Sequence, residues 1–179
     1  GNLTIGNEAL TLAGVGHSYG DGQGPWESGR TGALRNPAGD NTWGGTITLA
    51  GNAGIGSDNG SLLIDNATSV TSNTAPVTLR LVGTSTGANE ISGLIQNTNA
   101  NNLLLTKEGI GRWIVSGTAN TFAGKVTVNA GTLEVASLAN AGSTSSLGTG
   151  SLASIIDLGS ATFGSATLRY IGSGASTTN

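Results

Sequence analysis

The sequence predicts an all-β protein built as a parallel β-solenoid, a chain that winds repeatedly around one narrow core. Three observations indicate this fold. Strand-like segments are short and numerous, a nine-residue pattern occurs twice, and Gly, Thr, Ser and Asn make up about half of the 179 residues. Helices are not expected, because these four residue types favour turns, strands and caps over helix interiors. At roughly 20–25 residues per winding, we expect about eight windings.

Seven segments alternate aliphatic residues with Thr, Lys or Arg, which is the pattern of a strand with one buried face. They lie at residues 3–5, 10–12, 47–49, 77–81, 125–128, 132–135 and 167–171. Gly, Asn or Ser follows each segment within a few residues, so the connections are expected to be tight turns. Strands this short do not make a broad sandwich easily and suit a chain that coils.

The repeated pattern joins two distant parts of the chain. Residues 41–49 and 120–128 both read Asn-Thr-aromatic-small-Gly-polar-β-branched-Thr-aliphatic, 79 residues apart and without a gap. Each unit of a solenoid buries its apolar face only by stacking on the next, so such repetition is typical of this architecture. Inward Leu, Ile and Val would form the core, and outward Thr would stack in ladders.

Composition excludes several functional classes. Lys plus Arg number 7 against 10 acidic residues, so no surface for nucleic acid or anionic lipid is expected. The absence of Cys rules out disulfides and Cys-ligated metals. No apolar run approaches the ~20 residues of a membrane helix, so direct membrane insertion is not expected. The start Gly1-Asn2-Leu3, without a signal peptide, is interpreted as that of a processed piece of a longer protein.

The most specific motif lies at residues 105–135. It reads LTKEGIGRWIVSGTANTFAG up to residue 124 and continues into VTVNAGTLEV from residue 126. This stretch resembles the autotransporter-associated β-strand repeat, a passenger-associated repeat of type V secreted bacterial proteins with the rough pattern LTKxGxGTLxLSGxNTYxGxTxVxAGTLxV. Arg112-Trp113 replaces the usual Thr-Leu and Phe122 the usual Tyr, and the inward–outward alternation survives both changes. Residues 32–56 resemble the degenerate copies that accompany it.

The resemblance implies a right-handed parallel β-helix formed by residues 1–179 as a single segment of a bacterial passenger. After export, such a protein would lie outside the cell or on the outer-membrane surface, with the neighbouring windings of the parent protein as partners. The repeat is regarded in these proteins as a stalk element that helps the passenger to emerge and fold. The positions that would carry the repeat structurally are Asn41, Trp43, Gly45, Lys107, Gly109, Gly111, Gly117, Asn120, Phe122, Gly124 and Gly131.

Residues 16–40 differ from the rest of the chain and form a candidate inserted surface loop. They hold the only histidine and two of the three prolines. Loops on a rigid scaffold commonly carry function. Tyr19 and Trp26 could stack on sugar rings, with Asp21 and Glu27 as hydrogen-bond partners. The alternative is a plain surface loop, and part of this window matches the scaffold repeat.

No arrangement of residues indicates catalysis or a cofactor. Glycoside hydrolysis needs two facing carboxylates, and the acidic residues are spread along the chain. No Gly-x-Ser-x-Gly turn accompanies His17, so a serine triad is not expected. Residues 55–62 are only faintly similar to a calcium-binding turn and offer too few oxygens, so a plain turn is predicted. We therefore predict no enzyme activity, no cofactor and no metal.

Two further expectations concern individual side chains. Lys107 and Arg112 are predicted to be outward charges, and Glu108, Glu134 and Asp157 to be solvated outward positions. Trp43 and Phe122 occupy equivalent repeat positions. We expect them to cap the corner of a winding, and the alternative is an aromatic ladder for glycan stacking.

The function expected from the sequence is a structural stalk segment that extends a surface protein and supports its secretion and extracellular folding. The alternative is an adhesin module that binds glycan or a host protein through residues 16–40. In both cases the ends of the rod would expose unpaired strand edges, which favour end-to-end association.

Overall fold

The computed structural model describes residues 2–17, 31–74, 76–97, 103–150, 156–159 and 165–174. Regular structure in these ranges consists of sixteen β-strands. None of the described residues forms a helix with the length and apolarity needed to cross a membrane.

The strands form two parallel sheets. The first has seven strands in the spatial order β1-β4-β6-β9-β12-β14-β16. Their bounds are Thr4–Ile5, Asp40–Trp43, Ser61–Ile64, Glu90–Ile91, Arg112–Val115, Gly131–Val135 and Ala166–Tyr170. Spatial order therefore follows chain order, as it must when each winding is laid on the previous one.

The second sheet has nine strands, with seven in the order β10-β7-β5-β8-β11-β13-β15 and with β2 and β3 paired to β5. The bounds are β2 Leu10–Gly14, β3 Leu34–Asn36, β5 Ile47–Ser57, β7 Thr68–Ser72, β8 Val77–Val82, β10 Leu94–Ile95, β11 Leu103–Lys107, β13 Val126–Val128 and β15 Ile156–Leu158. The long strand β5 contacts β2 and β7 with its first half and β3 and β8 with its second half.

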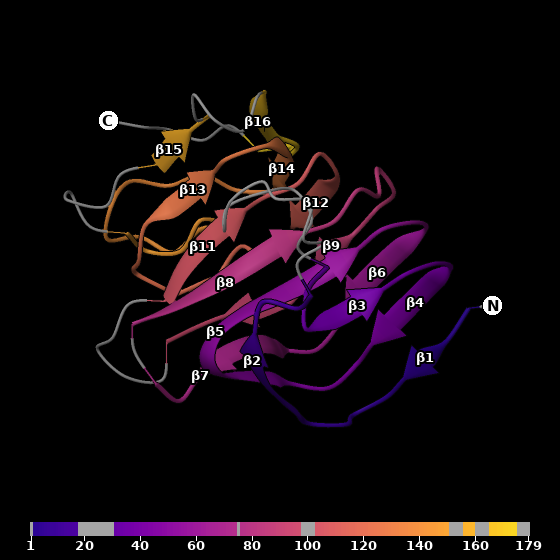
Figure 1. The fold of residues 1–179 in the computed structure, drawn as a ribbon. Coiled ribbons are helices and arrows are strands. Elements are labelled where there is room, and N and C mark those ends of the chain that lie inside the picture. The colour runs from indigo at the N-terminus through magenta and orange to yellow at the C-terminus, as the bar shows by residue number, and fades with distance from the viewer. Residues whose placement is uncertain are drawn as a thin grey trace.

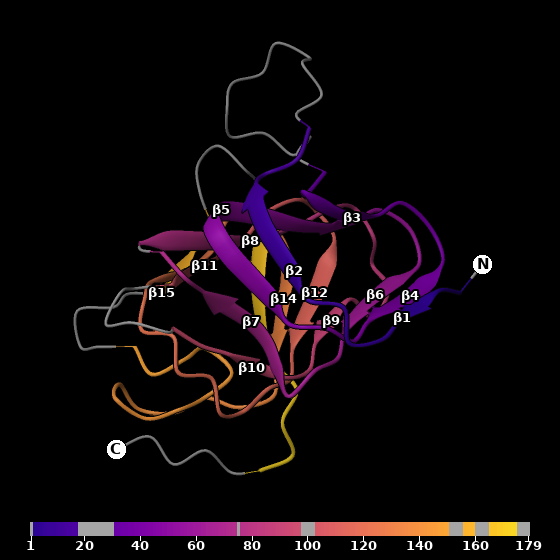
Figure 2. The ribbon, with the colours of Figure 1, turned by 90° about the horizontal axis from the view of Figure 1, so that it is seen from below.

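The chain passes repeatedly from one sheet to the other, sometimes after two consecutive strands in the second sheet, so the strands surround a common interior (Figures 1 and 2). Every pairing between named strands is parallel. The described residues thus form a parallel β-helix, which confirms the fold class predicted from the sequence.

Inward side chains stack in columns along the rod. One column in the first sheet runs Ile5–Trp43–Ile64–Ile91–Val115–Val135–Tyr170. A second column, in the other sheet, runs Leu34–Ile55–Leu81–Lys107–Val128–Leu158. The middle members of both columns are almost fully buried, and all of them except Lys107 belong to one continuous apolar core. Stacking of like on like is what lets this thin core form without many aromatic side chains.

The prediction of about eight windings stays a prediction. Among the described residues, the first sheet contains seven strands. Successive members of its column lie 38, 21, 27, 24, 20 and 35 residues apart. These spacings are longer on average than the roughly 20–25 residues expected per winding.

All seven predicted strand segments are strands in the structure. The strands that the sequence pattern missed include β9 and β10, which have two residues each and show no alternation.

Candidate functional site

The motif at residues 105–135 spans the end of β11, all of β12 and β13, and β14, which is slightly more than one winding. Lys107 is its most unusual residue. It occupies an inward position between Leu81 and Val128, and its side chain is completely buried. The prediction of an outward charge at Lys107 was wrong, because the alternation that places Leu103 and Leu105 inside also places residue 107 inside.

The Lys107 ammonium group is held by the backbone. Its Nζ atom donates hydrogen bonds to the carbonyl oxygens of Glu108 at 2.7 Å, Gly109 at 2.7 Å and Ala130 at 3.2 Å. Three N–H groups meet three acceptors, which offsets part of the cost of burying the charge. Burial lowers the pKa of Lys107 to about 7, against an opposing effect of the Glu108 charge. Because Ala130 lies in the next winding, this side chain joins two consecutive corners.

Glycines allow these corners to approach each other. Gly109 and Gly131 have φ angles of +71° and +67°, and a Cβ atom on Gly131 would lie 2.4 Å from the carbonyl oxygen of Gly111. Only glycine fits a position with both a left-handed backbone and a neighbour this close. A Cβ atom would also meet backbone atoms at less than 3 Å at the other predicted glycines, Gly45, Gly111, Gly117 and Gly124. Their structural role is therefore supported by packing.

Asn120 joins three windings through one buried amide. Its Oδ1 atom accepts the N–H of Ile95 at 2.8 Å in the previous winding. Its Nδ2 atom donates to the carbonyl of Gly117 at 3.1 Å and to that of Ser146 at 3.0 Å in the next winding. The side chain is 0% exposed, so these bonds replace ladder bonds that the corner lacks.

Asn89 makes the same type of connection and was missed from the sequence. Its Oδ1 atom accepts the N–H of Leu62 at 3.0 Å, and its Nδ2 atom donates to the carbonyl of Arg112 at 2.9 Å. It also is 0% exposed. The available signal was an Asn directly before a strand, which is too common in this chain to single out one residue.

Asn41, the repeat counterpart of Asn120, has different partners. Its Oδ1 atom accepts the N–H of Leu3 at 2.7 Å, and its Nδ2 atom donates to Oδ1 of Asn36 at 2.6 Å. The link to Leu3 still joins consecutive windings, with a different geometry from that of Asn120.

The two repeat aromatics lie against the core. Phe122 is completely buried, and Trp43 is partly buried in the column between Ile5 and Ile64. A buried Phe122 offers no face to a sugar, so the two residues do not form an exposed ladder for glycan stacking. Their positions agree with the predicted packing role.

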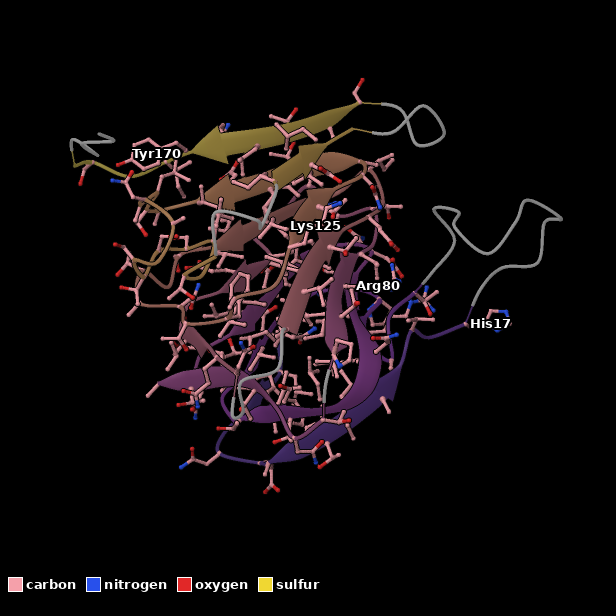
Figure 3. The ribbon with its side chains drawn as sticks, turned by 90° about the vertical axis from the view of Figure 1, so that its left-hand side faces the viewer. His17, Arg80, Lys125 and Tyr170 are labelled. Carbon is pink, nitrogen blue, oxygen red and sulfur yellow. The ribbon has the colours of Figure 1, made fainter. Side chains whose placement is uncertain are left out.

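Ion pairs also run between windings. Arg80 pairs with Glu108, Arg112 and Arg169 both pair with Glu134, Arg35 pairs with Asp58, and Lys125 pairs with Asp157. Every partner belongs to a different winding. Lys107 reaches Ala130 in the next winding through a hydrogen bond, so all six Lys and Arg residues in the described ranges connect windings. Figure 3 shows Arg80 and Lys125 on one side of the rod.

The prediction that Glu108 and Glu134 are solvated was wrong. The Glu134 side chain is 1% exposed between Arg112, at 2.9 Å, and Arg169, at 2.6 Å. Two cations in the adjacent strands offset the charge of a carboxylate that burial alone would penalise. Asp157 keeps the predicted exposure, at 41% of its side chain.

The candidate loop at residues 16–40 includes strand residues. The N–H of Thr31 donates to the carbonyl of His17 at 3.2 Å, and the chain then enters β3 and reaches β4 at Asp40. Residues 31–40 are therefore scaffold, which corrects the boundary of the predicted insertion. Tyr19, Asp21, Trp26 and Glu27 lie outside the described residues.

The turn once compared with a calcium site is a plain corner turn. Asp58 is paired with Arg35, and Gly60 adopts a φ of +81° against the backbone of Gly39. No group of three or more His, Cys, Asp or Glu residues suited to a metal occurs in the part of the chain that the structure describes. A polar hollow of about 530 Å³ lies beside this turn, lined by residues that include Asp40, Asn59, Ser61 and Thr86.

Comparison with known families matches residues 105–135 to the passenger-associated-transport-repeat. The segment is therefore similar to this repeat, and the match covers 31 of the 179 residues. Searches of curated proteins and of solved structures returned no match. The repeat, together with the all-β parallel fold, marks the chain as a segment of an autotransporter passenger and thus of a secreted or surface-exposed bacterial protein. The repeat contributes the Lys107 and Asn120 connections between windings.

Proposed function

We propose that this chain is a structural, non-enzymatic stalk segment of the passenger, which extends the surface protein and supports its secretion and extracellular folding. The observation that carries the proposal is that the positively charged side chains connect windings. Each described Lys and Arg is committed to another winding, by an ion pair or by the carbonyl contacts of Lys107. Such a surface holds the rod together and offers little free positive charge for nucleic acid or lipid.

The mode of stacking supports the folding part of the proposal. Each winding presents a sheet edge and inward side chains onto which the next winding is laid. In such a linear array, contacts are limited to neighbouring units, so folding can proceed one winding at a time as the chain emerges. The partners of the segment would be the neighbouring windings of the parent passenger.

An adhesin role through residues 16–40 is the second candidate, with a glycan or a surface protein as its ligand. The observation that favours it is the polar hollow of about 530 Å³, because Asp40 at the end of that window lines it. Its hydroxyl, amide and carboxylate groups could hydrogen-bond a sugar.

Surface display of the parent passenger separates the two roles. The segment is deleted in frame, and display of the remaining passenger is measured with an antibody to a distal epitope, alongside binding to a glycan array. A stalk role predicts a several-fold loss of display and of protease-resistant passenger. An adhesin role predicts unchanged display with lost binding, and the same loss from Trp26→Ala combined with Tyr19→Ala.

Point variants provide a matched test within the repeat. Lys107→Met removes a buried connection between windings, whereas Lys125→Met removes a pair in which both side chains are 41% exposed. A stalk role predicts that display of the whole passenger falls with Lys107→Met and is maintained with Lys125→Met. Equal display of both variants would contradict it.

A further inference from the structure

The corner that joins β5 to β6 contains a chemically reactive pair, Asn59-Gly60. Of the 17 asparagines in the chain, only Asn59 is followed by glycine. The Asn59 side chain is exposed, and Gly60 has a φ of +81°. The amide of an asparagine can be attacked by the next backbone nitrogen, and a glycine there leaves the approach open because it has no Cβ atom. This pair is therefore the place in the sequence where such an attack meets the least steric hindrance.

The reacting groups of the pair are unbonded in the part of the chain that the structure describes. Neither the Asn59 amide nor the N–H of Gly60 takes part in a hydrogen bond with a described residue. The corner is held through carbonyl groups instead. That of Gly60 accepts the hydroxyl of Ser85, and that of Asp58 accepts the hydroxyl of Thr84 at 3.0 Å. The Asn59 side chain can therefore rotate until its Cγ atom meets the Gly60 nitrogen.

The windings on both sides of this corner belong to the described chain. A Cβ atom on Gly60 would lie 2.3 Å from the carbonyl oxygen of Gly39 in the previous winding, and one on Gly87 in the next winding would lie 2.3 Å from that of Gly60. The exposure of Asn59 thus does not depend on where the sequence begins or ends. Asn59 and Gly60 both line the polar hollow of about 530 Å³, which is open to water.

Other asparagines of the corners are engaged by hydrogen bonds of their own. Their Nδ2 atoms donate to backbone carbonyls, as seen for Asn36, Asn66, Asn89 and Asn120. Each of these amides must give up its bonds before its Cγ atom can be attacked, so we expect them to react more slowly than Asn59.

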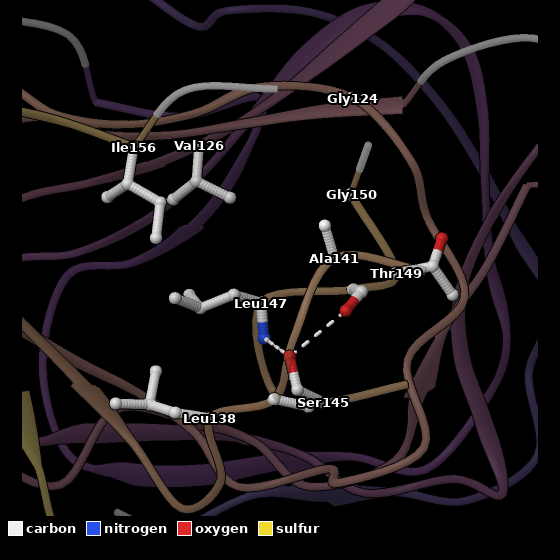
Figure 4. A pocket seen from close by; sticks show the side chains of 11 residues that line it. Gly124, Val126, Leu138, Ala141, Ser145, Leu147, Thr149, Gly150 and Ile156 are labelled. Atoms are coloured by element: carbon white, nitrogen blue, oxygen red, sulfur yellow. Dashed lines mark hydrogen bonds between the residues drawn. The ribbon is translucent and has the colours of Figure 1, made fainter. Parts of the chain in front are cut away.

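Asn140 provides a comparison within the same chain. It is exposed in a turn, where its carbonyl accepts the N–H of Ser143 at 3.0 Å. The next residue is Ala141, whose side chain Figure 4 shows at the wall of a pocket. Asn140 therefore matches Asn59 in exposure and differs from it in the Cβ atom of the following residue.

We propose that Asn59 is a site of spontaneous deamidation, a modification of the folded protein that needs no enzyme. Loss of the Gly60 N–H proton to hydroxide lets that nitrogen bond to Cγ of Asn59. The Cγ–Nδ2 bond then breaks, and the amide nitrogen takes up a proton from water and leaves as ammonia. Water opens the resulting five-membered imide at either carbonyl, which gives aspartate or iso-aspartate. The reaction consumes only water and releases only ammonia, and it goes beyond the stalk role.

Both products change the corner. Each adds one negative charge to a chain with a formal net charge of −3, beside Asp58 and in the hollow that Asp40 also lines. Iso-aspartate also lengthens the main chain by one carbon before Gly60, where the backbone of Gly39 leaves no space. The 3.2 Å hydrogen bond from the N–H of Ser61 to the carbonyl of Gly39 should then be lost. Deamidation is therefore expected to loosen the contact between two windings at this corner.

Mass spectrometry of the folded 179-residue chain tests the proposal. The protein is incubated at pH 8 and 37 °C in water enriched in heavy oxygen, and samples taken over several weeks are digested at acidic pH in ordinary water. Residue 59 is expected to exchange its amide nitrogen for heavy oxygen several-fold faster than residue 140 does. The rate should rise with pH, because the attacking nitrogen must lose its proton.

Asn59→Gln and Ala141→Gly are the matched variants. Asn59→Gln should remove most of the acidic form that accumulates on ion-exchange chromatography, because a glutamine would have to close a six-membered ring. Asn59→Asp marks the elution position of that form. Ala141→Gly should raise the rate at Asn140 several-fold, because it removes the Cβ atom that hinders the attack. Circular dichroism checks that each variant keeps its strand signal.

Four results would overturn the proposal. In the folded chain, residue 59 could convert no faster than residue 140, or it could convert only after unfolding in urea. The Asn59→Gln variant could accumulate acidic forms as fast as the wild type. Ala141→Gly could leave the rate at Asn140 unchanged, which would remove the steric argument.

Discussion

The Nζ atom of Lys107 donates a 3.2 Å hydrogen bond to the carbonyl oxygen of Ala130, 23 residues later and one winding further along the rod. With its two shorter bonds to Glu108 and Gly109, this contact ties the corner after β11 to the corner after β13. A single buried side chain therefore fixes the spacing of two windings inside the repeat.

Replacing Lys107 by Met is expected to lower the free energy of unfolding by roughly 2–4 kcal/mol at pH 9, because buried carbonyl oxygens lose their donor. Lys125→Met is the control, since exposed ion pairs contribute only about 0–1 kcal/mol. Urea titrations of both variants measure the difference. A similar decrease in the free energy of unfolding for both variants would show that the buried hydrogen bonds of Lys107 stabilise the fold no more than an exposed ion pair does.

The pH dependence of stability follows from the same residue. Burial lowers the pKa of Lys107 to about 7 in the folded chain from its ordinary value of 10.5, so between these values the unfolded chain binds more protons. Stability is therefore expected to rise with pH from 7 towards 10, by at most about 1.4 kcal/mol per pH unit, and to be lost again as pH falls to 7.

The comparison variant is Lys107→Met. In this variant the increase in the free energy of unfolding between pH 7 and pH 10 should disappear. Urea titrations at half-unit steps from pH 6.5 to pH 9.5 measure it. An unchanged slope in the variant would assign the pH dependence to other groups.

Replacing Asn120 by Ala is expected to cost roughly 3 kcal/mol, because the N–H of Ile95 and the carbonyl of Ser146 would lose their partner inside the rod. Asn140→Ala is a suitable control at an exposed position. Hydrogen exchange adds a local measurement, in which the amide of Ile95 should lose protection selectively. Equal protection in variant and wild type would argue against the connection.

Gly131→Ala is expected to destabilise the rod by about 3 kcal/mol or more, because its Cβ atom would collide with the carbonyl oxygens of Gly111 and Gly109. Gly142→Ala isolates the collision from the backbone strain. Gly142 also has a positive φ, of +89°, but nothing lies within 4 Å of its Cβ position. Its change should cost only about 1–2 kcal/mol, and thermal melts of the two variants should differ accordingly.

The sequence was informative where alternation extended over three or more residues. Val77, Leu79 and Leu81 indicate β8 because Thr78 and Arg80 alternate with them. The eleven-residue strand β5 was recognised only at its start, since its second half runs through Gly51, Gly54 and Gly56 and has no clear period. Glycine is there because the backbone of a neighbouring winding leaves no room for a Cβ atom at Gly56 and only a tight fit at Gly54.

The site was predicted less completely than the fold, for a physical reason. Lys107 and Glu134 read as surface charges because isolated charges are rarely buried. Lys107 is bonded to backbone carbonyls and Glu134 is paired with two arginines. Partners from other windings are far away in the sequence, so the sequence pattern does not identify them. The repeat motif marked the important positions without revealing which way the side chains point.

The distance between spin labels in one outward column tests the central claim most directly. Thr42 and Arg169 stand at opposite parts of the column Thr42–Leu63–Glu90–Ile114–Glu134–Arg169. Because the chain contains no native cysteine, Thr42→Cys with Arg169→Cys gives two unique labelling sites. Successive windings stacked as parallel strands predict one narrow distance distribution centred near ~24 Å, since neighbouring strands lie about 4.8 Å apart. A broad distribution, or a narrow one centred far from that value, would contradict the stacked rod.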